Sequence, residues 1–359
     1  MTHMQRALSL ARQALGTTSP NPPVGAVVVK DGEVVGEGFT QPYGHAHAEI
    51  VALTNSGPRS KGGTLYTTLE PCSHHGQTPP CTDAILQSGI VKVISATADP
   101  NPRVKGNGIS ILQDAGIQTH VGEEEDQAKK IIEAYLKFVE TGSPFVTVKF
   151  GSSLDGKIAT NTGESQWITG EQSLQVAHKL RATSDAIMVG INTVLTDDSK
   201  LTSRNLSGGN QEHQPLRVVV DSRCRIPPSA SMLKEPGHTL VAATNISAID
   251  QKQAEDAGAE ILQVPSENGR VDLVSLMKQL GARDITSVIV EGGGTLIGAL
   301  FDKGLVDKVI AFIAPTVIGG ISAPSAVMGL GIEHLIDATR LEHVEVEILG
   351  QDILISGYV

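Results

Sequence analysis

Four residues near the start of the chain constrain how it can fold. His47 and Glu49 lie in the run HAHAE, and Cys72 and Cys81 flank the segment SHHGQTPP. One imidazole and two thiolates suit Zn²⁺, and three protein ligands leave the fourth tetrahedral position open to water, as a catalytic zinc site requires. The alternative, a core histidine with two unrelated cysteines, needs four residue types to coincide by chance in one domain. The sequence therefore predicts His47, Cys72 and Cys81 as zinc ligands and Glu49 as the catalytic group that moves protons.

The segments around these residues predict an α/β domain. Apolar residues from Met4 to Leu15 recur at helical spacing, and GAVVVKDGEVVGEGF predicts two strands around an Asp31-Gly32 turn. Further along, we expect a helix at about 47–55, a strand at 63–68, a helix at 82–87 and one long amphipathic helix over EEEDQAKKIIEAYLKFVE. These elements form one three-layer domain.

A breaker cluster, Thr141-Gly142-Ser143-Pro144, separates this domain from the second half of the chain. We therefore expect two domains, residues 1–143 and 144–359. The second half alternates apolar strands with helical stretches, which predicts a largely parallel sheet, and it ends in a predicted hairpin around Gly350-Gln351-Asp352.

Composition and charge argue against several classes of protein. The chain has 359 residues and a formal net charge of −11, so it lacks the basic excess that binding to a nucleic-acid backbone requires. No apolar run reaches the length of a membrane span, and the start MTHMQRALSLARQAL is too polar for a signal peptide. Three cysteines, an odd number, argue against a disulfide framework. We expect a cytoplasmic protein.

Several motifs extend this interpretation to a family. The C-x8-C spacing is longer than the C-x-x-C of nucleobase deaminases. With that spacing, TSPNPPVGAVVV, HAHAE, TLEPCSHHGQTPPC and DPNPRVKGNGI resemble the deaminase half of the bifunctional RibD family of riboflavin biosynthesis. VKFGSSLDGKIA, SQWITG, SDAIMVGINTVLTDDSKLTSR and VEGGGTLIGAL resemble its reductase half. The resemblance implies a cytidine-deaminase-like domain followed by a dihydrofolate-reductase-like α/β domain.

The resemblance also implies two consecutive reactions. The first domain would use zinc to deaminate 2,5-diamino-6-ribosylamino-4(3H)-pyrimidinone 5′-phosphate, and the second would use NADPH to reduce the ribosyl side chain to ribityl. Asn21, His74 and Asn101 match family positions near the deaminase substrate. Two residues depart from the family pattern: Thr40 replaces a common His, and Gln77 replaces a common Lys. Both departures affect the contacts expected for the substrate phosphate.

A second site is expected where Glu291-Gly292-Gly293-Gly294-Thr295 follows the strand SVIV and opens a helix, because a helix N-terminus binds phosphate. The resemblance assigns to the cofactor Gly151, Trp167, Thr193, Asp197, Gly293, Gly294, Thr295, Leu296, Ile297, Gly298 and Ala299. The resemblance assigns to the substrate Ser165, Arg181, Leu201, Arg204 and Glu291. Lys157, a cation in an otherwise acidic domain, is added to this set.

Three of these residues carry specific expectations. Arg181 and Arg204 would converge on the 5′-phosphate of the substrate and bind it by bidentate hydrogen bonds. Trp167, the only tryptophan of the chain, would lie either in the core or against a flat ring of a ligand. No basic residue stands near Gly292 in the sequence, so the preference for NADPH rests on the resemblance.

Two other functions fit part of the pattern. One is a nucleoside or tRNA deaminase with an appended binding domain, against which the acidic charge and the second set of motifs argue. The other is a deaminase fused to a domain that senses NADPH without turnover, against which Lys157 and the two arginines argue. The partners we expect are a phosphorylated pyrimidine and further copies of the same chain in a homo-oligomer, with no nucleic acid and no membrane.

Overall fold

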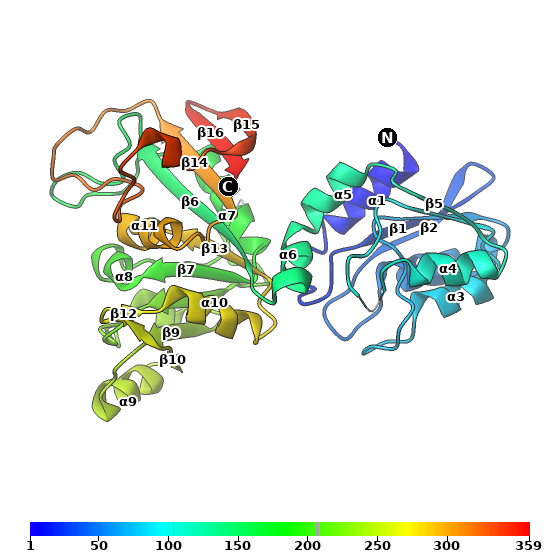
Figure 1. Ribbon diagram of the computed structural model, residues 1–359, viewed down its shortest axis with the longest axis horizontal. Helices are drawn as coiled ribbons and strands as arrows, with labels where there is room; N and C mark the ends of the chain where they lie inside the picture. Colours follow the sequence, from blue (N-terminus) through cyan, green and yellow to red (C-terminus); the bar gives the residue numbers. More distant parts are fainter. Residues whose placement is uncertain (103, 206–207) are drawn as a thin grey trace. The chain divides into compact units, whose positions relative to one another are not determined.

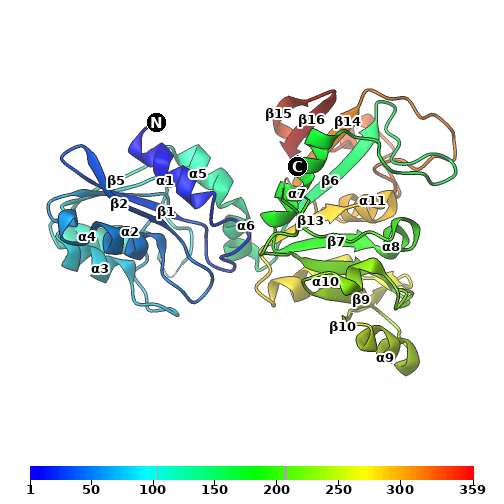
Figure 2. The same ribbon diagram turned by 180° about the vertical axis from the view of Figure 1, so that it is seen from behind.

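The computed structural model describes residues 1–102, 104–205 and 208–359. The chain divides into two compact units, Met1–Gly142 and Ser143–Val359, called unit 1 and unit 2 below (Figures 1 and 2). Within these described ranges, no helix is both long enough and apolar enough to cross a membrane.

Unit 1 is built on a five-stranded sheet with the order β2-β1-β3-β4-β5. β1 is antiparallel to β2 and β3, whereas β3, β4 and β5 run parallel to one another. The strands are β1 (Gly25–Lys30), β2 (Glu33–Phe39), β3 (Thr64–Thr67), β4 (Lys92–Ser95) and β5 (Gln118–Val121). The helices are α1 (His3–Ala11), α2 (Ala48–Ser56), η1 (Gly57–Ser60), α3 (Cys81–Ser88), α4 (Asn107–Asp114), α5 (Glu125–Ile131) and α6 (Glu133–Thr141).

Glycines let helices approach both faces of this sheet. A Cβ atom on Gly25 would lie 1.9 Å from the carbonyl oxygen of Ala7 in α1. On the other face, a Cβ atom on Gly36 would lie 2.3 Å from the carbonyl oxygen of Ala52 in α2. Only glycine permits such contacts without moving the helix. The expected three-layer arrangement is therefore present, with α2 pressed against the sheet.

The hairpin turn predicted for unit 1 is confirmed, but the prediction for its last helix is not. The β1–β2 hairpin turns at Asp31 and Gly32, whose φ angles of 51° and 85° suit the two central positions of a type I′ turn. The prediction of a single long helix at the end of the unit is wrong, because Ile132 (φ −100°, ψ 16°) separates α5 from α6. The buried residues Ile131, Ile132 and Tyr135 keep helical spacing across the break.

Unit 2 is built on a nine-stranded sheet with the order β10-β9-β8-β7-β13-β6-β14-β16-β15. Neighbouring strands from β10 to β14 are parallel, and β16 and β15 add an antiparallel hairpin at one edge. These strands are β6 (Phe145–Ser153), β7 (Ala186–Gly190), β8 (Leu216–Val220), β9 (Thr239–Ala243), β10 (Ala259–Gln263), β13 (Ser287–Glu291), β14 (Lys308–Ala314), β15 (Glu342–Leu349) and β16 (Asp352–Tyr358). A separate small hairpin is formed by β11 (Ser266–Glu267) and β12 (Arg270–Val271).

Helices cover both faces of the larger sheet. They are α7 (Glu171–Ala182), α8 (Ile191–Asp197), α9 (Ala248–Asp256), α10 (Leu273–Gly281) and α11 (Gly294–Asp302), with short 3₁₀ turns η2 (Ser231–Lys234) and η3 (Leu335–Asp337). Val288 and Val290 of β13 belong to a buried cluster that includes residues of α10 and α11, whereas Ile289 belongs to a cluster on the other face that includes residues of α8 and α9. This strand is buried on both faces, as is usual in parallel sheets. Both views show α8 and α11 at the carboxyl ends of β7 and β13 (Figures 1 and 2).

Candidate active sites

The metal ligands predicted from the sequence converge in unit 1. His47 lies at the N-terminus of α2, Cys81 is the first residue of α3, and Cys72 lies in the loop after β3. The Nδ1 atom of His47 is 3.3 Å from Sγ of Cys81 and 3.5 Å from Sγ of Cys72. A tetrahedral zinc with its usual bond lengths would separate such nitrogen and sulfur atoms by about 3.6 Å. The three donor atoms therefore fit zinc in both chemistry and spacing.

The surrounding groups favour this ligand geometry. The Nε2 atom of His47 lies 3.4 Å from Oγ1 of Thr78, so the ring can donate its other N–H there while Nδ1 faces the thiols. The backbone N–H of Cys81 donates to Sγ of Cys72 at 3.3 Å. The hydrogen bond from the Cys81 thiol lowers the pKa of Cys72, and the same bond raises the pKa of Cys81. A bound cation would favour the thiolate form of both cysteines.

Glu49 lies in the first turn of α2, one residue after buried Ala48, and is only 3% exposed. Burial, reinforced by the charge of Cys72, raises the pKa of Glu49 to about 7 when protein groups alone act on it. The positive charge of a metal ion would favour the ionised form. A buried carboxyl group beside the metal ligands can accept and return a proton, as general acid–base catalysis requires.

Glu70 has a positioning role that the sequence did not reveal. Its buried carboxylate accepts hydrogen bonds from four backbone N–H groups, those of Asp99, Gly106, Gly108 and Ile109, at 3.0–3.3 Å. These bonds attach the segment after β4 and the start of α4 to the loop that carries Cys72. The partners are far from Glu70 in the sequence, so spacing gave no signal.

The predicted substrate residues of unit 1, His74, Asn101 and Asn21, lie in three different loops. The Nδ1 atom of His74 is buried and has no hydrogen-bond partner within the described ranges, which leaves it available to a ligand. Asn101 follows Asp99, whose carboxylate accepts hydrogen bonds from the backbone N–H of Asn101 at 2.9 Å and from the hydroxyl of Tyr135 at 3.1 Å. Asn21 is half-buried, and its backbone N–H donates to the carbonyl oxygen of Thr18.

The two departures from the family pattern differ in environment. Thr40 is buried, and its hydroxyl accepts a hydrogen bond from the backbone N–H of Val24 at 3.0 Å. This residue therefore supports the backbone of unit 1. Gln77 is exposed in the loop between the two cysteines.

In unit 2, a cavity of about 430 Å³ lies at the carboxyl ends of β6, β7 and β13. Carboxyl ends of parallel strands are the usual place for ligands in open α/β sheets. Eleven of the residues predicted for this site line the cavity, namely Gly151, Ser165, Arg181, Thr193, Asp197, Leu201, Glu291, Gly293, Gly294, Thr295 and Ile297.

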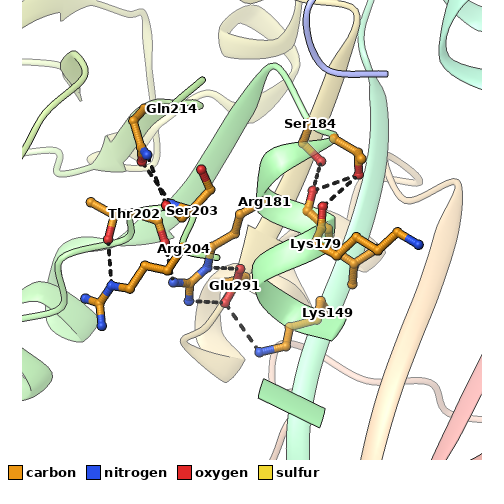
Figure 3. A network of polar contacts seen from close by, with 11 residues as sticks. Lys149, Lys179, Arg181, Ser184, Thr202, Ser203, Arg204, Gln214 and Glu291 are labelled. Carbon is orange, nitrogen blue, oxygen red and sulfur yellow. Dashed lines mark hydrogen bonds and ion pairs between the residues drawn. The ribbon is translucent and has the colours of Figure 1, made fainter. Parts of the chain in front are cut away.

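Three charged residues in the lining of this cavity, Lys149, Arg181 and Glu291, form a buried cluster. Figure 3 shows their side chains and contacts. Arg181 donates two hydrogen bonds to the carboxylate of Glu291, from Nε at 2.7 Å and from Nη2 at 2.8 Å. Lys149 of β6 donates to the same carboxylate at 3.3 Å. Burial would raise the pKa of Glu291, but Arg181 and Lys149 outweigh it and lower the pKa to about 2. Glu291 is therefore ionised at neutral pH and compensated by two cations.

Arg181 and Arg204, expected to bind one anion together, make different protein contacts in the structure. The third nitrogen of Arg181, Nη1, donates to the carbonyl oxygen of Thr202 at 3.2 Å, so each of its nitrogens has a protein acceptor. Arg204 donates from Nε to Oγ1 of Thr202 at 3.1 Å, and its guanidinium points away from Glu291 (Figure 3). It lines a separate cavity beside α7.

The other predicted residues of unit 2 lie outside the lining of the 430 Å³ cavity. Trp167 is 72% exposed, so its core alternative is wrong. The ammonium of Lys157 donates to the carbonyl oxygen of Ala323 at 3.0 Å and thereby joins two loops. Gly298 is buried where a Cβ atom would meet the carbonyl oxygen of Met328 at 1.6 Å. Leu296 and Ala299 line a second cavity of about 480 Å³.

Comparisons with known proteins identify a different family domain in each of the two units. The cytidine and deoxycytidylate deaminase zinc-binding region matches residues 1–97, and the RibD C-terminal domain matches residues 144–355. The riboflavin biosynthesis protein RibD of Escherichia coli is 42% identical over 98% of this chain and 97% of its own. The Aquifex aeolicus protein of the same name is 40% identical over 98% and 96%.

Solved structures give the same result. Acinetobacter baumannii RibD superposes with a TM-score of 0.88 at 38% identity, covering 99% of this chain and 97% of its own. A Thermotoga maritima protein, titled a diaminohydroxyphosphoribosylaminopyrimidine deaminase/5-amino-6-(5-phosphoribosylamino)uracil reductase, superposes with a TM-score of 0.85 at 35% identity, with coverages of 99% and 97%. The chain belongs to the RibD family. The fold class expected from the sequence is confirmed: a deaminase zinc-binding domain precedes a RibD reductase domain.

The sequence interpretation missed Lys149 in this RibD reductase domain. Its signal was a single lysine within the apolar strand FVTVKF, where an ionised side chain needs a buried partner. Glu291 supplies that partner from the neighbouring strand β13.

We predict that Arg181→Ala destabilises unit 2 by roughly 3 kcal/mol at pH 7, because it leaves a buried carboxylate short of one partner. The pKa of Glu291 is lowered, so the stability it contributes is fully present above its unfolded pKa near 4.5 and is lost as pH falls toward 2. The difference between wild type and variant should therefore shrink as pH falls from about 4.5. Urea denaturation followed by circular dichroism measures it.

The control is Arg283→Ala, which removes an ion pair with Glu260 whose side chains are 38% and 54% exposed. Its cost should stay below about 1 kcal/mol. Equal costs for the two variants, or a cost for Arg181→Ala that does not change with pH, would contradict the buried-cluster interpretation.

Proposed function

We propose that this chain performs two successive reactions of riboflavin biosynthesis. Unit 1 deaminates 2,5-diamino-6-ribosylamino-4(3H)-pyrimidinone 5′-phosphate by hydrolysis. Unit 2 then reduces the ribosyl side chain of that product with NADPH to give 5-amino-6-(5-phosphoribitylamino)uracil. The observation that carries the proposal is the convergence of His47, Cys72 and Cys81 beside buried Glu49, in a chain that resembles RibD proteins over nearly its whole length.

In the deaminase unit, His47, Cys72 and Cys81 would hold the zinc ion. When bound, zinc supplies a water acidic enough to act as hydroxide near neutral pH. Glu49 would pass one proton of the attacking water to the ring nitrogen. It would then carry the proton of the new hydroxyl to the amino group as the exocyclic C–N bond breaks, so that ammonia leaves and a carbonyl remains. Its place in the first turn of α2, two residues after His47, would keep the carboxyl beside the reacting carbon.

Three polar residues are proposed to orient the pyrimidine. The unpartnered Nδ1 of His74 is available for a substrate hydrogen bond, and Asn101 is held by Asp99. Asn21 would contact the ring from the loop before β1. The hydroxyl of Thr40 is hydrogen-bonded to the backbone of Val24, and Gln77 is uncharged. Other groups in this chain would therefore bind the substrate phosphate.

In the reductase unit, NADPH, when bound, would supply a hydride to the sugar carbon. Glu291, Lys149 and Ser165 are proposed to hold the ribosyl hydroxyls, because their polar groups line one cavity. Two nitrogens of Arg181 donate hydrogen bonds to the carboxylate of Glu291. We therefore propose that Arg181 positions this carboxylate for the substrate and does not bind the 5′-phosphate itself. Arg204 remains the candidate for the 5′-phosphate from an adjoining surface. The proposed cofactor residues are Gly151, Trp167, Thr193, Asp197 and those from Gly293 to Ala299.

We further propose a cytoplasmic homo-oligomer. The three cysteines are free thiols, and a reducing compartment keeps ligand thiols competent for zinc. An oligomer is favoured by β15, the edge strand of the nine-stranded sheet, where Val344, Val346 and Ile348 are 51%, 65% and 75% exposed. An exposed apolar edge strand offers a surface for a second copy.

We predict that Glu49→Gln keeps the metal and lowers deamination at least 100-fold, because the amide cannot move protons. NADPH oxidation with the already deaminated substrate should keep its wild-type kcat/KM. Product analysis with and without NADPH measures both steps, and exposed Glu33→Gln is the matched control.

Loss of both activities together would contradict two separate sites, and persistent deamination would remove Glu49 from the mechanism. A wild-type protein that binds NADPH without oxidising it on the deaminated substrate would instead support a nucleotide-sensing role for unit 2.

For the oligomer, sedimentation velocity should give a mass of at least two chains for the wild type. Val346→Lys should shift the distribution toward monomer, because a charge on an edge strand opposes pairing. Ile249→Lys, on the exposed surface of α9, should leave the mass unchanged. A monomeric wild type would contradict the proposal.

A further inference from the structure

A second cavity continues the reductase site along the sheet edge. It has a volume of about 480 Å³ and shares Asn192, Thr193, Gly293 and Thr295 with the 430 Å³ cavity that contains Glu291. The shared residues come from the starts of α8 and α11, which follow the adjacent strands β7 and β13. The two cavities therefore form one elongated groove across the carboxyl ends of the strands, with the glycine turn at its middle.

The far end of this groove is built from β8 and the small β11–β12 hairpin. Ser222 and Arg223 follow β8, and both line the second cavity together with Asn268 and Arg270 of the hairpin. The hairpin turns at Asn268 and Gly269, with φ angles of 51° and 76° that suit a type I′ turn. Its position is fixed by a hydrogen bond of 3.0 Å from the backbone N–H of Val271 to Oγ of Ser222.

Two arginines at this end lack protein counter-charges. Arg223 and Arg270 are exposed at the cavity, and neither has an ion-pair partner among the residues placed in the structure. Arg225 lines the same cavity but donates to Oδ1 of Asn192 at 3.1 Å and lies 3.8 Å from Asp221. The carboxylate of the hairpin, Glu267, is itself paired with Lys303. Positive charge is thus concentrated in one place on a chain whose net charge is −11.

We propose that Arg223 and Arg270 bind the 2′-phosphate of NADPH and thereby select it over NADH. The inference rests on the proposed reduction, which places the nicotinamide beside Glu291. The pyrophosphate would then lie at the glycine turn, and the adenosine would reach the end lined by the two arginines. A phosphate monoester carries nearly two negative charges at neutral pH, and guanidinium groups bind it by bidentate hydrogen bonds. NADH has only a hydroxyl there.

The positions of Arg223 and Arg270 in the sequence give no indication of this phosphate site. Arg223 follows β8 and Arg270 begins β12, so neither stands near Gly292 along the chain. The parallel order β8-β7-β13 brings the end of β8 beside the glycine turn, because the carboxyl ends of parallel strands share one edge of the sheet.

The test compares adenosine 2′,5′-bisphosphate with 5′-AMP, using isothermal titration calorimetry on the full chain. The wild type should bind the bisphosphate more tightly. Arg223→Ala and Arg270→Ala should each weaken that binding about tenfold, and the double variant should lose the discrimination, with 5′-AMP affinity unchanged throughout. In kinetics, KM for NADPH should rise while kcat and the KM for NADH stay near wild type. Lysine at either position should restore part of the affinity.

Arg340→Ala is the matched control, because this exposed arginine lies outside both cavities. The double variant should also keep the wild-type melting temperature and deaminase activity. A double variant that still prefers the bisphosphate, or that loses both nucleotides equally, would overturn the inference. If the wild type oxidises NADPH, such a result refutes only the arginine assignment. A wild type that binds neither the bisphosphate nor NADPH would refute the reductase proposal as well.

Discussion

The close packing of α2 against the sheet of unit 1 determines the position of the deaminase groups. Gly36 allows the contact, since a Cβ atom there would lie 2.3 Å from the backbone of Ala52. Packed in this way, α2 presents His47 at its N-terminus and Glu49 in its first turn, opposite Cys81 at the start of α3. A ligand at a helix start is held by backbone on one side, so the donor atoms are oriented before any metal binds.

The two units compensate their buried charged groups in different ways. In unit 1, a cation held by His47 and the cysteines would balance thiolates and favour ionised Glu49. In unit 2, Glu291 is balanced by Arg181 and Lys149, so no metal is needed to keep it ionised. Removal of one partner from either cluster leaves an uncompensated charge, and both sites are therefore sensitive to single substitutions.

Much of the fold and the metal centre could be predicted from the sequence, because their signals are local or chemically distinctive. The Asp31-Gly32 turn and the terminal hairpin follow from turn residues, and the zinc ligands follow from ligand chemistry. The break at Ile132 was missed because the buried residues on both sides of it keep helical spacing, so periodicity gives no signal of an interruption. Lys149 and Glu70 were missed for another reason: their partners lie on distant segments that only the fold brings together.

The central claim is that His47, Cys72 and Cys81 form an open zinc site. X-ray absorption at the zinc edge on the purified full chain tests it most directly. We expect one zinc per chain with one nitrogen at about 2.0–2.1 Å, two sulfurs at about 2.3 Å and one oxygen, and the loss of one sulfur in Cys72→Ser. A coordination shell with no sulfur or with four sulfurs, or undiminished deamination after complete removal of the metal, would contradict the account.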